Sequence, residues 1–268
     1  MKSVKQVLII GCGWLGKPLG KTLSDAGYRV FGTTRDQDKL KDLKQYDIEP
    51  IVLDLMQQSD AMEQLPKVDF TILTVPPSGI SSVEHELHSV LKQLLQMPRL
   101  GQFIYTSSTS VYPNTNGEVN ESDAEEIYSP HSGKSVLRIE NELRKYQPNF
   151  NILRFGGLFG NGRNPVTRLA KKSELSKAED PVNMTHLQDA IKSIETLLLK
   201  EVKSETFNAV SPEHPTKLQF YRAAAEKEGV NLPNAANEPK SDYKIVSSQK
   251  IIEQLNYTFT YQNPIEAL

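Results

Sequence analysis

The sequence predicts an α/β fold with a doubly wound parallel sheet, and three observations support this prediction. Short apolar runs typical of buried strands alternate with longer segments in which apolar residues recur at helical spacing. A glycine-rich turn follows the first apolar run directly. The chain has 268 residues, of which 38% are hydrophobic, so it can bury one large core with or without a small additional lobe.

The first half of the chain begins with the apolar run Val7–Ile10, which ends at Gly11 and is typical of a strand buried on both faces. Residues 14–26 carry apolar side chains at helical spacing, and Gly27 suits the end of that helix. Further strands are expected at residues 28–33, 51–53, 69–75 and 102–106, with helices at 37–46 and 83–97.

The second half continues the alternation and then becomes more polar. Helices are expected at residues 132–146, 186–199, 215–228 and 247–255, and strands at 151–154 and 206–208. Strands joined by helical crossovers predict a parallel sheet. Two charged segments, residues 118–126 and 171–180, are expected to be solvated loops, and the second could instead cover a site.

Charge and composition exclude several classes of function. The chain has 31 basic and 33 acidic residues, a net charge of −2, which argues against nucleic acid or an anionic membrane as the main partner. No apolar stretch approaches eighteen residues, so no transmembrane helix is expected. Cys12 is the single cysteine, which excludes an intrachain disulfide and a cysteine metal cluster. The N-terminus lacks the features of a signal peptide, and we expect a cytoplasmic protein with a small-molecule partner.

The turn at residues 11–16 reads G-C-G-W-L-G, which matches the dinucleotide-binding pattern G-x-G-x-x-G between a strand and a helix. In this pattern Gly11 permits the tight turn, Gly13 lets a pyrophosphate approach the backbone, and Gly16 lets the helix pack on the sheet. The helix start, with Trp14 and Leu15, offers backbone N–H groups to the phosphates. The turn therefore predicts a bound dinucleotide, whereas Cys12 fills a variable position and receives no redox role.

The end of the second strand indicates which dinucleotide binds. An NAD site usually carries an acidic residue there for the ribose 2′-hydroxyl, but this chain has Thr33, Thr34 and Arg35. Two hydroxyls and a guanidinium suit a 2′-phosphate, so the sequence favours NADP. Asp36 follows at once, which keeps NAD as the alternative.

Several separate stretches together resemble the extended short-chain dehydrogenase/reductase family. The chain is most similar to its atypical, epimerase/dehydratase-like branch, which includes the bacterial YeeZ-type proteins. The matching stretches are residues 11–16, 53–55, 103–112, 153–160 and 182–189, with a C-terminal strand and helix within residues 243–255.

The resemblance implies a Rossmann core at residues 1–160 and a small substrate-facing lobe at residues 161–268 that partly returns to the core sheet. It also implies that Asp54 and Leu55 line the adenine pocket. Val75, Pro76 and Pro77 would lie along the cofactor at the end of the fourth strand.

The family transfers a hydride at a carbonyl or alcohol carbon, and the resemblance assigns roles to two residues. Ser108 matches the Ser that orients the reacting oxygen, and Lys134 matches the Lys that holds the nicotinamide ribose and lowers the pKa of a Tyr. That Tyr should stand four residues before Lys134, where this chain has Pro130.

Three explanations for Pro130 stay open. Tyr128 or His131 could exchange the proton in place of the missing Tyr, although the simpler interpretation of each is an ordinary loop residue. The substrate or a water molecule could supply the proton, with Ser108 and Lys134 assisting. Alternatively, the protein binds NADP without turning over a substrate.

Four further residues occupy regions that face the substrate in the family: Arg163, Asn164, Asn183 and His186. Asp189 is expected to be structural. The apolar faces of the helices at 83–97 and 132–146 could form a homodimer or could simply pack on the sheet.

A metal site is not expected. His85 and His88 are three residues apart, whereas the zinc-protease motif places two histidines four residues apart on one helix face.

Together with the family resemblance, the sequence predicts an NADP-dependent oxidoreductase or epimerase-like enzyme acting on a small carbonyl or sugar-derived substrate. The alternative is a non-catalytic NADP-binding protein with a sensor or partner-binding role.

Overall fold

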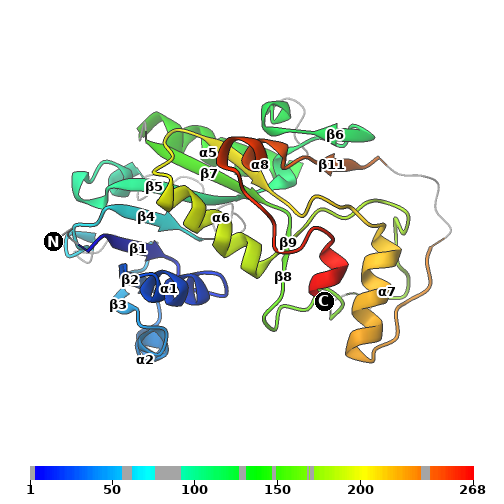
Figure 1. Ribbon diagram of the computed structural model, residues 1–268, viewed down its shortest axis with the longest axis horizontal. Helices are drawn as coiled ribbons and strands as arrows, with labels where there is room; N and C mark the ends of the chain where they lie inside the picture. Colours follow the sequence, from blue (N-terminus) through cyan, green and yellow to red (C-terminus); the bar gives the residue numbers. More distant parts are fainter. Residues whose placement is uncertain are drawn as a thin grey trace. The chain divides into compact units, whose positions relative to one another are not determined.

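The computed structural model describes residues 4–55, 62–75, 92–126, 131–146, 149–167, 169, 172–236 and 242–268. Strands and helices alternate through these segments, as Figure 1 shows. None of the helices in the described segments combines the length and the hydropathy that a membrane-spanning helix needs.

The central element is a seven-stranded sheet with the strand order β10-β7-β5-β4-β1-β2-β3. Its strands are β1 (Gln6–Ile10), β2 (Arg29–Thr34), β3 (Glu49–Val52), β4 (Phe70–Leu73), β5 (Gln102–Ser108), β7 (Phe150–Phe155) and β10 (Thr206–Ala209). The strands β3, β2, β1, β4 and β5 pair in parallel in this order. The predicted doubly wound parallel sheet is confirmed.

The helices also follow the prediction, within a few residues at most ends. They are α1 (Gly16–Asp25), α2 (Leu40–Lys44), α5 (His131–Tyr146), α6 (Leu187–Leu199), α7 (Lys217–Glu228) and α8 (Gln249–Leu255). Most of the helix expected at residues 83–97 lies outside the described residues, and residues 92–95 are helical.

The chain forms two compact units, each made from separate segments. The first unit contains Met1–Ser108, Lys134–Leu153 and Ile194–Thr206. The second contains Thr109–Gly133, Arg154–Ser193 and Phe207–Leu268. The units interleave along the chain because it leaves the first unit after β5 and returns to it within α5. The single division at residue 160 that the sequence suggested remains a prediction.

The core of the first unit is one continuous cluster of buried apolar side chains. Leu8 and Ile10 of β1, Leu73 of β4 and Tyr105 of β5 are all at most 2% exposed, and they pack in one cluster with Ile139 of α5. Burying these side chains supplies the main stabilisation of the sheet, at about 1.5–3 kcal/mol for each large apolar side chain.

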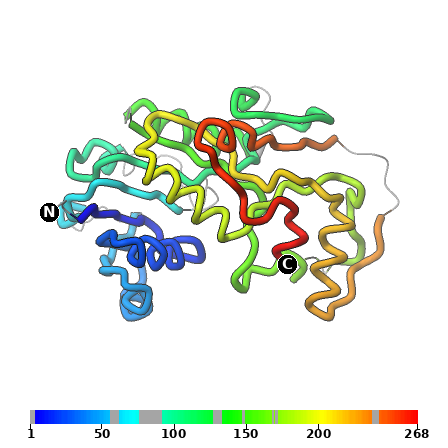
Figure 2. The backbone as a smooth tube through the Cα atoms, viewed as in Figure 1, coloured from blue at the N-terminus to red at the C-terminus, as the bar shows by residue number. Residues whose placement is uncertain are grey.

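The second unit contains two short parallel pairs whose pairing the sequence did not predict, although β11 lies within the C-terminal strand and helix that the family resemblance implied. Strand β6 (Gly117–Val119) pairs with β11 (Lys244–Val246), and β8 (Gly157–Phe159) pairs with β9 (Met184–His186). Figure 2 shows β6 and β11 side by side although they are far apart in the sequence. Three-residue strands are too short to give a recognisable alternation of apolar and polar residues.

The two charged segments are only partly solvated. Leu175 is fully buried and Ala178 is nearly so, and both pack with Leu218 and Tyr221 of α7. In the other segment, the Glu121 side chain accepts a hydrogen bond from the Asn208 backbone, and burial raises the pKa of that carboxyl group. The prediction of solvated loops is wrong for these residues, because a charged composition hides single inward-facing positions.

Two matching stretches of the family resemblance meet in a buried polar network. The Arg154 guanidinium donates to the Tyr112 hydroxyl at 2.7 Å, and that hydroxyl donates to the Asn208 side chain at 2.6 Å. Arg154 is 4% exposed and also donates to the Glu121 carbonyl. A buried charge needs such partners, so these residues are structural members of the second unit.

Asp189 anchors the C-terminal segment, as its expected structural role requires. Its fully buried carboxylate accepts hydrogen bonds from the Thr260 and Tyr261 backbone N–H groups at 2.6 and 3.2 Å. The Tyr257 hydroxyl donates to the same carboxylate at 3.3 Å and to the Asp189 carbonyl at 3.0 Å.

We expect Asp189→Ala to lower the free energy of unfolding by about 3 kcal/mol, because it leaves buried backbone donors without an acceptor. Chemical denaturation measures this loss. Asp25→Ala is the control, because Asp25 is exposed and forms only a surface ion pair with Lys21, so little change is expected. Equal, small effects of both substitutions would contradict the anchoring role.

Candidate functional site

The candidate site lies at the carboxyl edge of the sheet in the first unit. Five strands end there in parallel, and each is followed by or ends in a residue of the sequence-predicted site: Gly11, Thr34, Asp54, Val75 and Ser108. The strand order reverses between β1 and β4 (Figure 1), and open α/β sheets bind their ligands at such a point.

Hydrogen bonds hold the glycine turn against the end of β2. Gly11 has a φ of +96°, and its N–H donates to the Thr33 hydroxyl at 3.0 Å. The Cys12 N–H donates to the Thr33 carbonyl at 2.9 Å, and the Gly13 N–H donates to the Gly11 carbonyl at 2.7 Å. Thr33 is 2% exposed, so it orders the turn from inside the protein.

The glycines leave room for a phosphate group. A methyl group at Gly13 would meet only the Gly11 carbonyl oxygen, at 4.0 Å, so the space beside Gly13 is open. At Gly16 a methyl group would lie 3.0 Å from the Gly11 carbonyl oxygen and 3.2 Å from Ile9, so this glycine allows α1 to pack closely.

The N-terminus of α1 suits an anion. No side chain caps it, and no acidic residue lies in its first turn. Backbone N–H groups and the helix dipole favour a phosphate at such an end. Together with the open space at Gly13, this arrangement fits the pyrophosphate of a dinucleotide.

The Cys12 side chain points inward, and its thiol has low reactivity. Its Sγ lies 3.7 Å from the Ile9 carbonyl oxygen, and a methyl group at Gly32 would lie 2.5 Å from the sulfur. Burial raises the pKa of the Cys12 thiol to about 12. The thiol therefore stays protonated at neutral pH.

The segment after β2 contains Arg35, whose guanidinium is exposed, and Asp36, whose carboxylate is engaged in local contacts. The Asp36 side chain accepts a hydrogen bond from the Asp38 backbone at 3.0 Å and lies 3.3 Å from the Lys39 ammonium group. These two contacts lower the pKa of Asp36. Arg35 is exposed and forms no ion pair within the part of the chain that the structure describes. The acidic residue is thus engaged locally, whereas the cationic one is available to a ligand.

Ser108 and Lys134 are both half-buried, at the end of β5 and near the start of α5. Two close approaches hold these segments. A methyl group at Gly133 would lie 2.0 Å from the Ser110 carbonyl oxygen, so only glycine permits this packing. The Ser107 hydroxyl donates to the Glu140 carboxylate at 2.5 Å, and Glu140 is 1% exposed.

The sequence does not predict the contact between Ser107 and Glu140. A serine beside Ser108 and a glutamate on a charged helix look like surface residues, and only their burial identifies their contact. Their signal in the sequence was weak: Glu140 interrupts the apolar stripe of α5 between Ile139 and Leu143.

The other expected cofactor contacts are described in part. Asp54, Leu55 and Val75 are half-buried after β3 and β4. His131 is the first residue of α5. Pro76, Pro77, Tyr128 and Pro130 lie outside the described residues, as do His85 and His88. Within the described segments, no group of three or more histidine, cysteine or carboxylate side chains could hold a metal ion.

The residues expected to face a substrate lie in the second unit, and three of them, Asn164, Asn183 and His186, have structural side-chain contacts. The Asn183 amide donates to the Lys244 carbonyl at 3.0 Å and accepts from the Val246 N–H at 2.8 Å. These two hydrogen bonds hold β11 in place. The His186 ring accepts from the Gln188 N–H at 3.3 Å. Burial lowers the pKa of His186, so its ring is neutral at neutral pH.

Arg163 and Asn164 belong to a tight loop after β8. The backbones of Gly160 and Arg163 exchange hydrogen bonds, and the Asn164 side chain accepts from the Val166 N–H at 2.8 Å. The Arg163 side chain is exposed. Substrate contacts of all four residues remain predictions.

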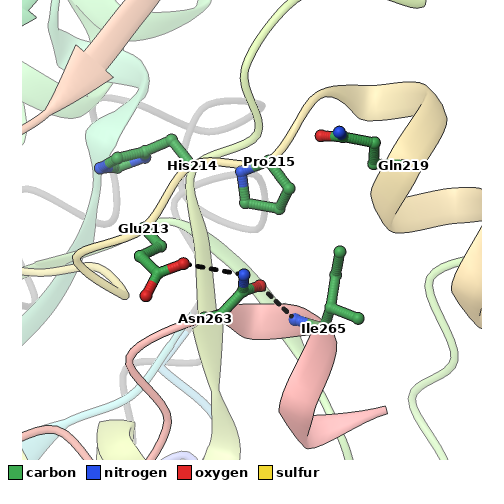
Figure 3. Close-up of a pocket in the computed structure, with 6 residues that line it drawn as sticks. All are labelled: Glu213, His214, Pro215, Gln219, Asn263 and Ile265. Atoms are coloured by element: carbon green, nitrogen blue, oxygen red, sulfur yellow. Dashed lines mark hydrogen bonds between the residues drawn. The ribbon is translucent and has the colours of Figure 1, made fainter.

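A hollow of about 460 Å³ lies elsewhere in the second unit, and Figure 3 shows its lining. It is lined by Glu213, His214, Pro215, Gln219, Asn263 and Ile265. Several of its polar side chains form hydrogen bonds within the protein. Asn263 donates to the Glu213 carboxylate and accepts from the Ile265 N–H, both at 2.9 Å. Gln219 accepts from the Thr216 N–H. None of the sequence-predicted site residues lines this hollow.

Comparisons with known proteins agree with the glycine turn. The model of a family described as NAD(P)H-binding matches residues 11–190. The chain belongs to this family. Protein YeeZ of Escherichia coli K12 is 30% identical over 271 residues, with 98% of each chain covered. The dinucleotide-binding prediction and the resemblance to the YeeZ-type proteins are confirmed.

Solved structures of epimerases share the fold of this NAD(P)H-binding protein. UDP-glucuronic acid 4-epimerase from Bacillus cereus, in complex with NAD, is 19% identical with a TM-score of 0.77. UDP-N-acetylglucosamine 4-epimerase from Bacillus cereus is 21% identical with a TM-score of 0.72. Each likeness covers 98% of this chain and 96% of the other. At these identities the likeness concerns the fold alone.

We expect Gly13→Ala to weaken NADPH binding by about tenfold or more, because its methyl group occupies the open space while making no close contact with the protein. Fluorescence titration measures the affinity, and thermal unfolding should show an unchanged Tm. Gly133→Ala should instead lower the Tm, because its methyl group would lie 2.0 Å from the Ser110 carbonyl oxygen. Unchanged affinity in Gly13→Ala would contradict the phosphate site.

Cys12 should react slowly with iodoacetamide. At pH 8 we expect alkylation more than about a hundredfold slower in the folded protein than in guanidinium-unfolded protein, because the raised pKa removes the thiolate. Mass spectrometry follows the reaction. Equal rates in the two states would show that the thiol is neither buried nor suppressed.

Proposed function

We propose that this NAD(P)H-binding protein is an NADP-dependent oxidoreductase or epimerase-like enzyme acting on a small carbonyl or sugar-derived substrate. The observation that carries the proposal is the arrangement at the carboxyl edge of the sheet. The glycine turn opens a space for the pyrophosphate, and the exposed Arg35 stands beside a carboxylate that is engaged elsewhere.

The preference for NADP rests on charge. A 2′-phosphate carries negative charge that a guanidinium binds through charge-assisted hydrogen bonds. In an NAD site the acidic residue would bind the ribose hydroxyl, but Asp36 instead caps the short helix Gln37–Lys39. Thr34 supports the same turn, because its hydroxyl accepts a hydrogen bond from the Asp36 N–H at 3.2 Å.

A bound nicotinamide supplies hydride transfer to or from a substrate carbon. In this proposal Ser108 orients the reacting oxygen, and Lys134 holds the nicotinamide ribose. The proton comes from Tyr128 or His131, from the substrate itself or from water. Ser108 and Lys134 are held by contacts of their chain neighbours: Gly133 packs on Ser110, and Ser107 forms a hydrogen bond with Glu140.

A second function stays open because Pro130 stands where the family has its proton-exchanging Tyr. Proline has no group that exchanges a proton. A protein that kept Arg35 and Lys134 for the cofactor but lost its acid would act as an NADP-binding sensor or partner-binding protein.

Arg35→Ala should lower the affinity for NADPH by about 10- to 100-fold and leave the affinity for NADH unchanged, because only NADPH carries the 2′-phosphate. Lys41→Ala, which removes an exposed positive charge nearby, is the matched control and should bind both cofactors normally. Equal affinities of the unmutated protein for NADH and NADPH would refute the preference for NADP.

The catalytic assignment is tested by NADPH oxidation with a panel of small aldehydes, ketones and keto sugars. We expect slow turnover, and Ser108→Ala should lower kcat by about tenfold or more because the reacting oxygen loses its hydrogen bond. Tyr128→Phe and His131→Ala identify the proton donor if one of them loses activity. Tight NADPH binding without any turnover would favour the sensor.

A further inference from the structure

Lys244 lies on the inner face of the β6–β11 pair in the second unit. Val246 shares its face of β11, because side chains two residues apart point the same way, and Val246 is 1% exposed. Lys244 itself is half-buried. A charged side chain therefore points toward the interior of this unit, a position that a strand normally gives to an apolar residue.

Among the residues that the structure describes, the ammonium group of Lys244 has one hydrogen-bond partner, the Tyr112 carbonyl oxygen at 2.6 Å. Within the described segments Lys244 forms no ion pair, and burial lowers its pKa to about 8. Glu118 cannot balance this charge from the facing strand, because its register partner is Ile245, whose side chain points to the opposite face. Two of the three ammonium N–H donors are left for another acceptor.

Open space lies on the strand face that carries Lys244. Gly117 is the register partner of Lys244, so its side-chain position lies on the same face. A methyl group at Gly117 would meet only the Thr115 hydroxyl, at 4.0 Å. We use the term Lys244 notch for Lys244, Gly117 and the Tyr112 carbonyl group.

The backbone around the Lys244 notch is held on both sides. Strand β6 pairs with one edge of β11, and the Asn183 amide bonds the Lys244 carbonyl and the Val246 N–H on the other. Lys244 is thus presented by a rigid element. A preformed, partly desolvated cation binds an anion better than a flexible surface lysine does.

We propose that the Lys244 notch binds an anionic group, a phosphate or a carboxylate, of a small-molecule ligand. The anion would accept hydrogen bonds from the two remaining ammonium N–H groups and occupy the space beside Gly117. This inference goes beyond the cofactor site, because no residue of the notch belongs to the proposed NADP contacts. Failure of its test leaves the proposed function untouched.

The test is an NMR titration of ¹⁵N-labelled protein with sodium phosphate and, separately, with sodium acetate, at constant ionic strength set by sodium chloride. We expect the Gly117 amide signal to shift and saturate with at least one of the two anions, and the comparison tells phosphate from carboxylate. Lys244→Met should abolish the saturable shift, and Lys244→Arg should retain it.

Lys217→Met is the matched control, because the Lys217 ammonium group also donates to a backbone carbonyl, that of Ser176, at 2.6 Å. This variant should titrate like the unmutated protein. A shift that never saturates, or one that persists in Lys244→Met, would overturn the proposal.

A second readout does not depend on how Lys244→Met folds. Biosynthetic ¹³C labelling of lysine makes the side-chain Cε signals of the unmutated protein visible by NMR without altering the ammonium groups, and Lys244→Arg assigns the Lys244 signal. Its pKa should rise by about one unit when the anion that saturates is present, because a nearby negative charge favours the protonated amine. A pKa that does not change would count against the site.

Discussion

The candidate site depends on one interaction, the pair of hydrogen bonds that ties the glycine turn to Thr33. The Gly11 N–H reaches the Thr33 hydroxyl and the Cys12 N–H reaches its carbonyl oxygen, so the turn after β1 is joined to the end of β2. Because Arg35 lies two residues beyond Thr33, the same contacts relate the pyrophosphate space to the residue proposed to select NADP. Thr33 thus acts from the interior, a different contribution from the direct 2′-phosphate contact that the sequence suggested.

The opposite side of the site is held by packing between β5 and α5. Gly133 lets the helix start approach the chain after β5, and Glu140 receives the Ser107 hydroxyl about two turns later. A buried carboxylate without a partner would be costly, so the hydrogen bond fixes how α5 is rotated about its axis. Ser108 and Lys134 adjoin these contacts in the chain. Neighbouring residues without a proposed catalytic role therefore position the two predicted catalytic residues.

Much of this architecture could be predicted from the sequence, because long periodic segments and the glycine turn have strong local causes. The order of β1 to β5 and the ends of α1, α6 and α7 follow from such patterns. The short pairs β6–β11 and β8–β9, the burial of Leu175 and the Arg154–Tyr112–Asn208 network could not be predicted, since each joins residues far apart in the sequence. Asn183 shows the same limit: its family position suggested a substrate contact, and its amide pins β11.

The central claim is that the carboxyl edge of the sheet binds the dinucleotide through the glycine turn and the end of β2. Hydrogen–deuterium exchange of the unmutated protein with and without NADPH tests it most directly, since it reports on each segment of the chain separately. The account predicts slower exchange at residues 11–17 and 33–36, with little change in α7 and α8. Unchanged exchange at the glycine turn, or protection confined to the second unit, would contradict it.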